Sequence, residues 1–235
     1  MMTYTKSNPL QVVTLCSGYD SQCMALDRIG IPYELLAWAE IDKYAIQAHN
    51  LNYPQWADRN LGDMSKIDWT KVEGRIDLLT YSTPCQDISN AGLQRGIEEN
   101  SGTRSSLLWF TRNAILAKKP RYLMLENVKA LVSKKFMPGF QKWLDELESY
   151  GYKSFWKVLN AKDYGVPQNR ERVFVISILK TEDDPDPQFF FPEPFPLEKR
   201  LMDILEPKVD EKYYLAKKSL DYFFQNAEVQ YDAEE

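Results

Sequence analysis

Residues 12–29 read VVTLCSGYDSQCMALDRI, a short apolar run followed by a turn of small residues and then by a segment with helical spacing. Residues 12–16 favour a strand because they are rich in Val and Leu, and Ser21–Ile29 has the apolar spacing of a helix. The turn between them, residues 17–21, would direct backbone N–H groups at the helix N-terminus toward a ligand. This stretch therefore predicts the first strand and helix of an α/β protein, with a binding site where they meet.

The same alternation of strands and helices continues along the chain. Apolar runs rich in Val, Ile, Leu and aromatic residues predict further strands at residues 35–39, 76–81, 122–126 and 173–179. Helical spacing predicts helices at residues 43–50, 105–118 and 139–150. Strands separated by helices favour a mixed, mostly parallel sheet with helices on both faces. Such a sheet binds ligands at the carboxyl ends of its strands.

Composition narrows the class of protein and the kind of chemistry. The chain has 235 residues, 44% of them hydrophobic and 27% charged, which suits a folded domain. No apolar stretch approaches the roughly 18 residues of a membrane span, so we expect a cytoplasmic protein without membrane association. The single histidine, His49, excludes mechanisms that need two histidines. Three cysteines without a CxxC spacing argue against a disulfide framework or a zinc site, and we predict no metal.

Charge and composition divide the chain near residue 180. Residues 181–235 carry 15 acidic and 6 basic side chains, whereas residues 1–180 carry 19 acidic and 23 basic ones. The first part is mildly basic, which is compatible with a phosphate-bearing partner but does not establish one. We predict one domain over residues 1–180. Residues 181–235 would be a linker rich in Pro and Phe, followed by short helices.

Acidic residues follow the early strands. Glu40 ends the second predicted strand, where nucleotide-binding sheets place the acid that holds a ribose hydroxyl. The pattern G-x-G-x-x-G is absent, however, so the segment around Gly18 is equally consistent with a tight turn and nothing more. Asp63, in Leu61-Gly62-Asp63-Met64, is a second polar candidate for the same ligand, although an acid in a loop is more often simply solvated.

The third predicted strand leads to a cysteine. The sequence Ser82-Thr83-Pro84-Cys85 follows that strand, and Pro84 restricts the backbone just before Cys85. A cysteine in such a loop can act as a thiolate nucleophile. The alternative is a small buried apolar residue, which is also how we interpret Cys16 and Cys23.

Charged residues flank the last two predicted strands. Glu126 ends an apolar strand, and its partial desolvation favours a protonated carboxyl group that can act as a proton donor; otherwise it caps a helix. In Gln168-Asn169-Arg170-Glu171-Arg172, the alternating arginines would point to one face, suited to a phosphate or a carbonyl oxygen. The alternative is a surface ladder of ion pairs with Glu171.

In this order, the motifs resemble those of the cytosine-C5 DNA methyltransferase family. The resemblance covers about residues 12–179 and rests most on Pro84-Cys85-Gln86, Glu126-Asn127-Val128 and the arginine motif. It implies the Rossmann-like fold of S-adenosylmethionine-dependent methyltransferases. It also implies a DNA (cytosine-5-)-methyltransferase that acts on double-stranded DNA and transfers a methyl group from S-adenosyl-L-methionine to carbon 5 of a flipped cytosine.

The resemblance assigns a role to each matching residue. Cys85 would attack carbon 6 of the cytosine, Glu126 would hold and protonate N3, and Arg172 would bind O2. Arg170 would orient the nucleophile loop and the DNA backbone, and Asn127 would order that loop. Cofactor contacts would come from Cys16, Ser17, Gly18, Glu40, Ile41, Asp63, Met64 and Pro84, and DNA contacts from Gln86, Ser89 and Gln168.

Two departures from the family pattern stand out. The first motif usually reads Asp-Leu-Phe-Ala-Gly-x-Gly-Gly, but here only Leu15 and Gly18 match, and Cys16 replaces an aromatic residue that packs on the cofactor. No segment after Tyr213-Tyr214-Leu215 resembles the family's target-recognition region or its last two motifs. We therefore expect a fragment of a longer enzyme, one half of a split enzyme whose partner polypeptide recognises DNA, or a defective remnant.

Other classes of function are ranked lower. A non-catalytic module of the same ancestry would be expected to lack Cys85, Glu126 or the arginine pair, and all are present. A nicotinamide-dependent oxidoreductase is disfavoured by the missing glycine pattern, whereas an RNA methyltransferase would share the same motifs. The motifs leave open the target sequence, the oligomeric state and the setting, whether restriction–modification, phage or solitary.

Overall fold

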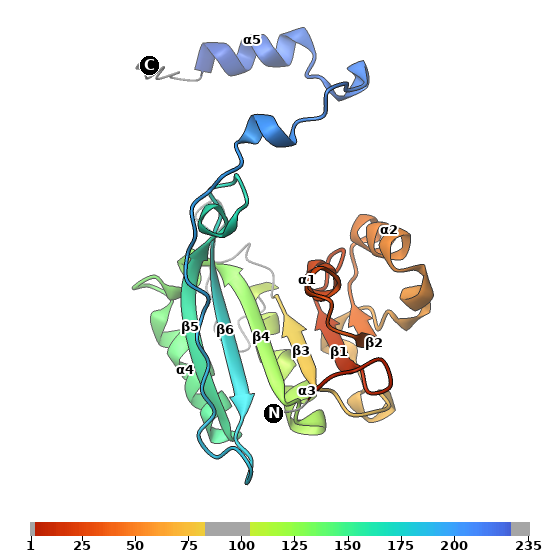
Figure 1. Cartoon of the computed structure of the whole chain (residues 1–235), viewed down its shortest axis with the longest axis vertical. Helices are drawn as coiled ribbons and strands as arrows, with labels where there is room; N and C mark the ends of the chain where they lie inside the picture. Colours follow the sequence, from red (N-terminus) through yellow and green to blue (C-terminus); the bar gives the residue numbers. More distant parts are fainter. Residues whose placement is uncertain (1–2, 83–103, 227–235) are drawn as a thin grey trace.

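A computed structural model describes residues 3–82 and 104–226 of the chain. Within these residues, six strands form one sheet in the order β2-β1-β3-β4-β6-β5 (Figure 1). Their bounds are β1 Leu10–Leu15, β2 Tyr33–Ala39, β3 Leu78–Tyr81, β4 Tyr122–Val128, β5 Tyr152–Asn160 and β6 Glu171–Leu179. The first four strands run parallel, whereas β6 is antiparallel to both β4 and β5. The expectation of a mixed, mostly parallel sheet is confirmed.

Helices cover both faces of the sheet. They are α1 Ser21–Ile29, α2 Lys43–Asn52, α3 Thr111–Lys118 and α4 Met137–Ser149, with α5 Lys217–Asn226 farther along the chain. One buried cluster joins Val12 and Trp38 to α1 and to the residues after α2, whereas the other joins Val13 and Ala37 to α3 and α4. Since neighbouring residues of a strand point to opposite faces, these clusters lie on the two sides of the sheet. The expected two-sided cover is confirmed.

Local sequence signals set the limits of the first two helices. The Asp42 carboxylate accepts hydrogen bonds from the Tyr44 and Ala45 amides at the start of α2, the standard role of an N-cap acid. After α1 comes Gly30 with φ +69°, a left-handed conformation that glycine adopts without steric cost. The predicted bounds of α1 agree with those observed.

Two elements differ from the sequence prediction. Strand β5 was not predicted, because YKSFWKVLN mixes polar and apolar residues at the end of the sheet, where most of its side chains keep some exposure. The single helix expected over residues 105–118 is a 3₁₀ segment, Arg104–Phe110, followed by α3. Leu108 and Trp109 of the 3₁₀ segment are both buried.

The segment rich in Pro and Phe runs alongside β5 after the sheet ends at Leu179 (Figure 1). The Phe189 ring lies 6.1 Å from the Phe155 ring of β5, and the Phe195 amide donates to the Asp163 carbonyl. The segment is therefore an extended strap with aromatic contacts to the sheet. Residues 201–226 then project away from the sheet (Figure 1).

The division into a domain over 1–180 and a linker over 181–235 stays a prediction. No helix within residues 3–82 and 104–226 is long and apolar enough to cross a membrane.

Candidate active site

A cavity of about 940 Å³ opens at the carboxyl ends of β1, β3 and β4. Its walls come from the turn after β1, the start of α1, the end of β3, strand β4 and the β5–β6 connection. Seven of the predicted site residues line it: Cys16, Ser17, Gly18, Glu126, Gln168, Arg170 and Arg172. The structure thus brings the predicted cofactor turn and the predicted catalytic charges to one cavity.

The turn after β1 has an unusual backbone. Cys16, Gly18 and Asp20 all have positive φ values, of 50°, 59° and 61°. A Cβ atom added at Gly18 would meet nothing within 4 Å, so the backbone faces open space there. The Ser17 hydroxyl is buried and has no hydrogen-bond partner among the described residues. Because buried polar groups are nearly always paired, this hydroxyl is suited to a polar ligand.

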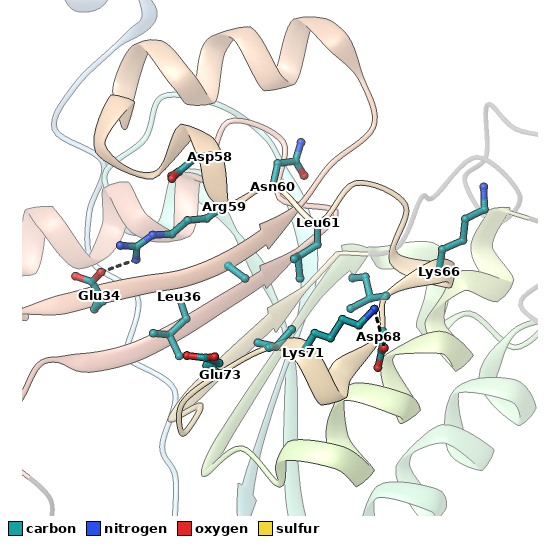
Figure 2. A pocket seen from close by; sticks show the side chains of 13 residues that line it. Glu34, Leu36, Asp58, Arg59, Asn60, Leu61, Lys66, Asp68, Lys71 and Glu73 are labelled. Atoms are coloured by element: carbon teal, nitrogen blue, oxygen red, sulfur yellow. Dashed lines mark hydrogen bonds and ion pairs between the residues drawn. The ribbon is translucent and has the colours of Figure 1, made fainter.

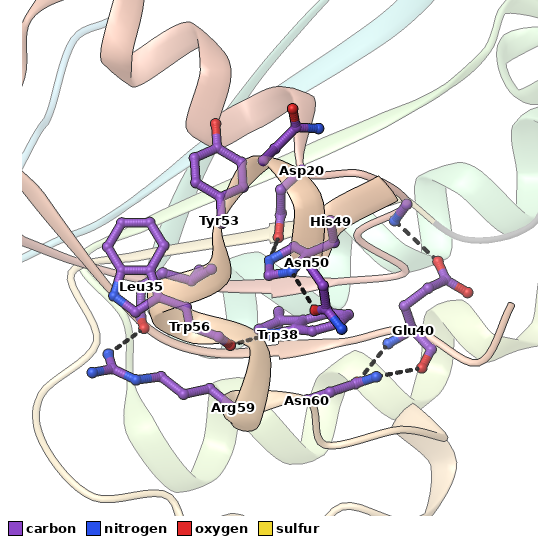
Figure 3. A network of polar contacts seen from close by, with 12 residues as sticks. Asp20, Leu35, Trp38, Glu40, His49, Asn50, Tyr53, Trp56, Arg59 and Asn60 are labelled. Atoms are coloured by element: carbon purple, nitrogen blue, oxygen red, sulfur yellow. Dashed lines mark hydrogen bonds and ion pairs between the residues drawn. The ribbon is translucent and has the colours of Figure 1, made fainter. Parts of the chain in front are cut away.

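Glu40 is tied directly to this turn (Figure 3). Its carboxylate accepts hydrogen bonds from the Gly18 amide at 3.0 Å and from the amides of Ile41 and Asp42 at 2.8 and 2.9 Å. The Asn60 side chain holds the Glu40 backbone, accepting from its amide and donating to its carbonyl. Three amide donors stabilise the negative charge and fix the orientation of the carboxylate beside the turn.

Of the other predicted cofactor residues that the structure describes, Ile41, Asp63 and Met64 do not line this cavity, and neither does Glu40. Ile41 is 72% exposed. The Met64 sulfur lies 3.4 Å from that of Cys16. Burial, and then the charges of Glu40 and Asp63, raise the pKa of the Cys16 thiol to about 12, so this cysteine is a neutral packing residue. The Asp63 carboxylate accepts from the hydroxyl and amide of Ser65, which lowers its pKa.

Glu126 is held from three directions at the floor of the cavity. The Ser82 hydroxyl donates to its Oε2 at 2.9 Å, and the Arg172 Nε lies 3.0 Å from its Oε1. A guanidinium nitrogen of Arg170 lies 4.0 Å from the same Oε1. The side chain keeps 24% exposure. These contacts orient the carboxyl group, and its predicted role as a proton donor stays a prediction.

The arginine motif adopts the arrangement that the sequence predicted. Arg170 and Arg172 both approach Glu126, whereas Glu171 turns to Lys129, with 2.8 Å between the Lys129 Nζ and a carboxylate oxygen. The arginine side chains therefore do not form the alternative ladder of ion pairs with Glu171. At the end of β5, Asn160 accepts from the Arg170 amide at 3.1 Å and so fixes this connection.

Five predicted residues remain to be placed. Pro84, Cys85, Gln86 and Ser89 lie outside the described residues. Asn127 is buried next to Glu126, and its side-chain oxygen accepts from the Val128 amide at 2.8 Å. Asn127 does not line the cavity.

Other lining residues were not predicted from the sequence. Ser82 directly follows β3, so the rule that ligands lie at strand ends could have identified it. Asn160 and Tyr164 also line the cavity, but they follow β5, which was itself missed. These two residues could not be placed at a strand end because β5 was not predicted.

A second cavity of about 570 Å³ lies along the outer side of β2 (Figure 2). It contains none of the predicted site residues that the structure describes. Part of its charge is neutralised internally, by ion pairs of Arg59 with Glu34 and of Lys71 with Asp68. Among residues 3–82 and 104–226, no group of three or more His, Cys, Asp or Glu side chains is arranged to hold a metal ion.

Comparison with known proteins identifies the family. A model described as C-5 cytosine-specific DNA methylase matches residues 10–232. The chain belongs to this family. It is 38% identical to the type II methyltransferase M2.ScrFI of Lactococcus lactis subsp. cremoris, over 88% of this chain and 70% of that protein. It is 35% identical to the type II methyltransferase M.SsoII of Shigella sonnei, over 76% of this chain and 45% of that protein.

Solved structures confirm the methyltransferase fold. Dnmt2 methyltransferase of S. pombe matches with a TM-score of 0.67 at 20% identity, over 92% of this chain and 66% of that one. A DNMT2 mutant of Spodoptera frugiperda matches with a TM-score of 0.71 at 20% identity, over 89% of this chain and 63% of that one. This chain spans 70% of M2.ScrFI but only 48% to 54% of three other relatives, from two Bacillus phages and Neisseria lactamica.

Proposed function

We propose that this chain carries the catalytic part of a DNA (cytosine-5-)-methyltransferase. Its substrate would be a cytosine flipped out of double-stranded DNA, and its place of action the cytoplasm. The observation that carries the proposal is the shared cavity, in which Glu126, held by Ser82 and Arg172, lies opposite the Ser17–Gly18 turn. Membership of the C-5 cytosine-specific family supports the same reaction.

S-adenosyl-L-methionine is the cofactor that the family implies, and the residues present fit it. The buried Ser17 hydroxyl lacks a partner among the described residues, the backbone at Gly18 faces open space, and the Glu40 carboxylate is oriented beside both. These three residues would hold the cofactor, and the proposed contact set also includes Cys16, Ile41, Asp63, Met64 and Pro84. When bound, the cofactor supplies the methyl group that carbon 5 receives.

Cys85 is the proposed nucleophile on the strength of its place in the sequence, three residues after Ser82. Its thiolate would form a bond to carbon 6 of cytosine while ring electrons move toward N3, where Glu126 donates a proton. This addition makes carbon 5 electron-rich, so that it can accept a methyl group. Loss of the carbon-5 proton to a base would then restore the ring, expel the thiolate and return the N3 proton to Glu126.

The remaining proposed roles concern orientation. Arg172 would bind the cytosine O2 while its Nε stays beside Glu126, and Arg170, half exposed, would orient the nucleophile loop and the DNA backbone. Asn127 would order that loop, and Gln86, Ser89 and Gln168 would contact DNA.

Target recognition is proposed to need more than the catalytic part. The chain spans about half the length of several relatives, which supports a further region or a partner polypeptide that reads the DNA sequence. In this arrangement residues 1–180 form the catalytic domain and residues 181–235 the linker to the recognition part.

Covalent trapping on DNA that contains 5-fluorocytosine tests the proposal, because fluorine blocks the final elimination. With S-adenosylmethionine present, the wild-type chain and Cys23→Ser should form an adduct that survives denaturation, and Cys85→Ser should form none. Cys23 is the matched control because it is a buried thiol of α1. No adduct, but cofactor binding by calorimetry, would show that the missing partner or region is required. Absence of both adduct and cofactor binding would contradict the proposal.

A further inference from the structure

A buried ion pair that the mechanism above does not use lies behind the cofactor turn. The Nε2 of His49, in α2, lies 3.0 Å from Oδ2 of Asp20, and both side chains are fully buried. Figure 3 shows the imidazole between Asp20 and the Trp38 ring of β2. The two rings are stacked, with centroids 3.7 Å apart. The Nδ1 lies 3.3 Å from the Asn50 side-chain oxygen, so each ring nitrogen has an oxygen atom nearby.

Asp20 is unusual for a residue that precedes a helix. An aspartate at this position normally accepts a hydrogen bond from a backbone amide of the first turn. Here the side chain makes no capping bond, and the backbone is left-handed, with φ 61° and ψ 55°. A residue with a Cβ atom is disfavoured in this conformation unless its surroundings hold it. The carboxyl group points inward instead, where it is fully buried and its Oδ2 lies 3.0 Å from the Nε2 of His49.

The conformation of Asp20 is coupled to the residues proposed to bind the cofactor. Its amide donates to the Ser17 carbonyl at 2.9 Å, which closes the turn that contains Gly18. On the other side of the turn, the Gly18 amide donates to Glu40. The turn is thus anchored at both ends, by Glu40 at Gly18 and by His49 at Asp20.

We propose that His49 is a positioning residue for cofactor binding. Through Asp20, it holds the turn of residues 17–20, in which Gly18 and Asp20 are left-handed, so that the turn presents the Ser17 hydroxyl and the Gly18 backbone to S-adenosylmethionine. His49 itself does not line the cavity. The inference rests on the proposed function, because it assumes that this turn receives the cofactor.

Three variants separate this role from simple packing. His49→Phe keeps an aromatic ring on Trp38 but removes the ring nitrogen that contacts the buried Asp20 carboxyl group, and we expect the affinity for S-adenosylmethionine to fall by about tenfold or more. Asp20→Asn keeps a side chain that tolerates the left-handed region, and its affinity should stay within about threefold of wild type. The double variant, Asp20→Gly with His49→Phe, should regain affinity to within about threefold, because glycine adopts this backbone without an anchor.

The measurements are the dissociation constant by calorimetry and the melting temperature without cofactor for each variant. Equal affinity of folded His49→Phe and wild type would overturn the inference, as would a double variant as weak as His49→Phe. If His49→Phe does not fold, the affinities of Asp20→Ala and Asp20→Gly for S-adenosylmethionine test the inference instead. Alanine should weaken binding and glycine should not, and equal binding by the two would overturn the inference. A wild-type chain that binds no S-adenosylmethionine would overturn the proposed function along with it.

Discussion

The Ser82 hydroxyl donates a hydrogen bond to the Glu126 carboxylate, with 2.9 Å between Ser82 Oγ and Glu126 Oε2. Ser82 directly follows β3, and Glu126 lies on β4, the neighbouring parallel strand, so the sheet itself sets their separation. The same hydroxyl lies 3.2 Å from the Glu126 carbonyl oxygen. Ser82 therefore connects the proposed acid to the strand end that leads to Cys85.

Removal of this hydroxyl should slow the reaction without weakening cofactor binding. We expect Ser82→Ala to reduce the rate of adduct formation on 5-fluorocytosine DNA by about tenfold, since a hydrogen bond to a charged group contributes about 1.5–3 kcal/mol. Ser82→Thr keeps the hydroxyl and should react at a rate near that of wild type. Stopped-time trapping of the adduct, beside calorimetry of the cofactor, checks both parts. An unchanged rate for Ser82→Ala would show that Arg172 alone orients Glu126.

Loss of the proton on Glu126 should have a larger effect. Glu126→Gln preserves the size of the side chain and one of the two oxygens that face Ser82 and Arg172, but it cannot transfer a proton to N3. General acid catalysis contributes about 10²–10⁴-fold, so we expect adduct formation to fall by at least about 100-fold. The melting temperature and the cofactor affinity should change little. A loss of less than tenfold would mean that another group protonates the ring.

The sequence predicted the parts of the fold that follow regular patterns. Strands β1 to β4 and β6 were found because buried strands carry continuous apolar runs, and α1 was found because its apolar residues have helical spacing. Strand β5 was missed since an edge strand with alternating polar residues gives no such run. The antiparallel direction of β6 follows from the β5–β6 pairing, which depends on contacts that no local pattern encodes.

The site, too, has features that the local sequence predicts and features that depend on packing. Glu40 and Glu126 were identified because each stands at the carboxyl end of a predicted strand, and such ends meet at one edge of a sheet. Arg172 was identified from its motif and reaches the same edge because β6 is antiparallel to β4. The pairing of Asp20 with His49 was not predicted, because it depends on how α2 packs over β2. A lone histidine in a helix carries no signal that a carboxylate from another segment lies 3.0 Å away.

Cys16 should be a poor nucleophile despite its place in the site. Because burial first, and Glu40 next, raise its pKa to about 12, only about one thiol in ten thousand is ionised at pH 8. The thiolate fraction of Cys16 should rise as the pH approaches this pKa. In the Cys85→Ser variant, iodoacetamide at pH 8 should leave Cys16 unmodified over the time that consumes free cysteine, as checked by mass spectrometry of digests. The same protein in denaturant is the control and should be labelled rapidly. Labelling of the folded chain at the rate of free cysteine would contradict the raised pKa of Cys16.

The carboxylate of Glu40 should be essential for the shape of the cofactor turn. In Glu40→Gln one oxygen becomes an NH₂ group, so in either orientation a donor faces the amide of Gly18 or the amides of Ile41 and Asp42. Because an unsatisfied bond to a charged group costs about 1.5–3 kcal/mol, the dissociation constant for S-adenosylmethionine should rise by about tenfold to 100-fold. Glu73→Gln makes the same change of charge at an exposed position of the second cavity and should bind as wild type does. Calorimetry of the three proteins measures the difference. If Glu40→Gln and Glu73→Gln bind the cofactor equally well, the turn is held by the Asp20 anchor alone.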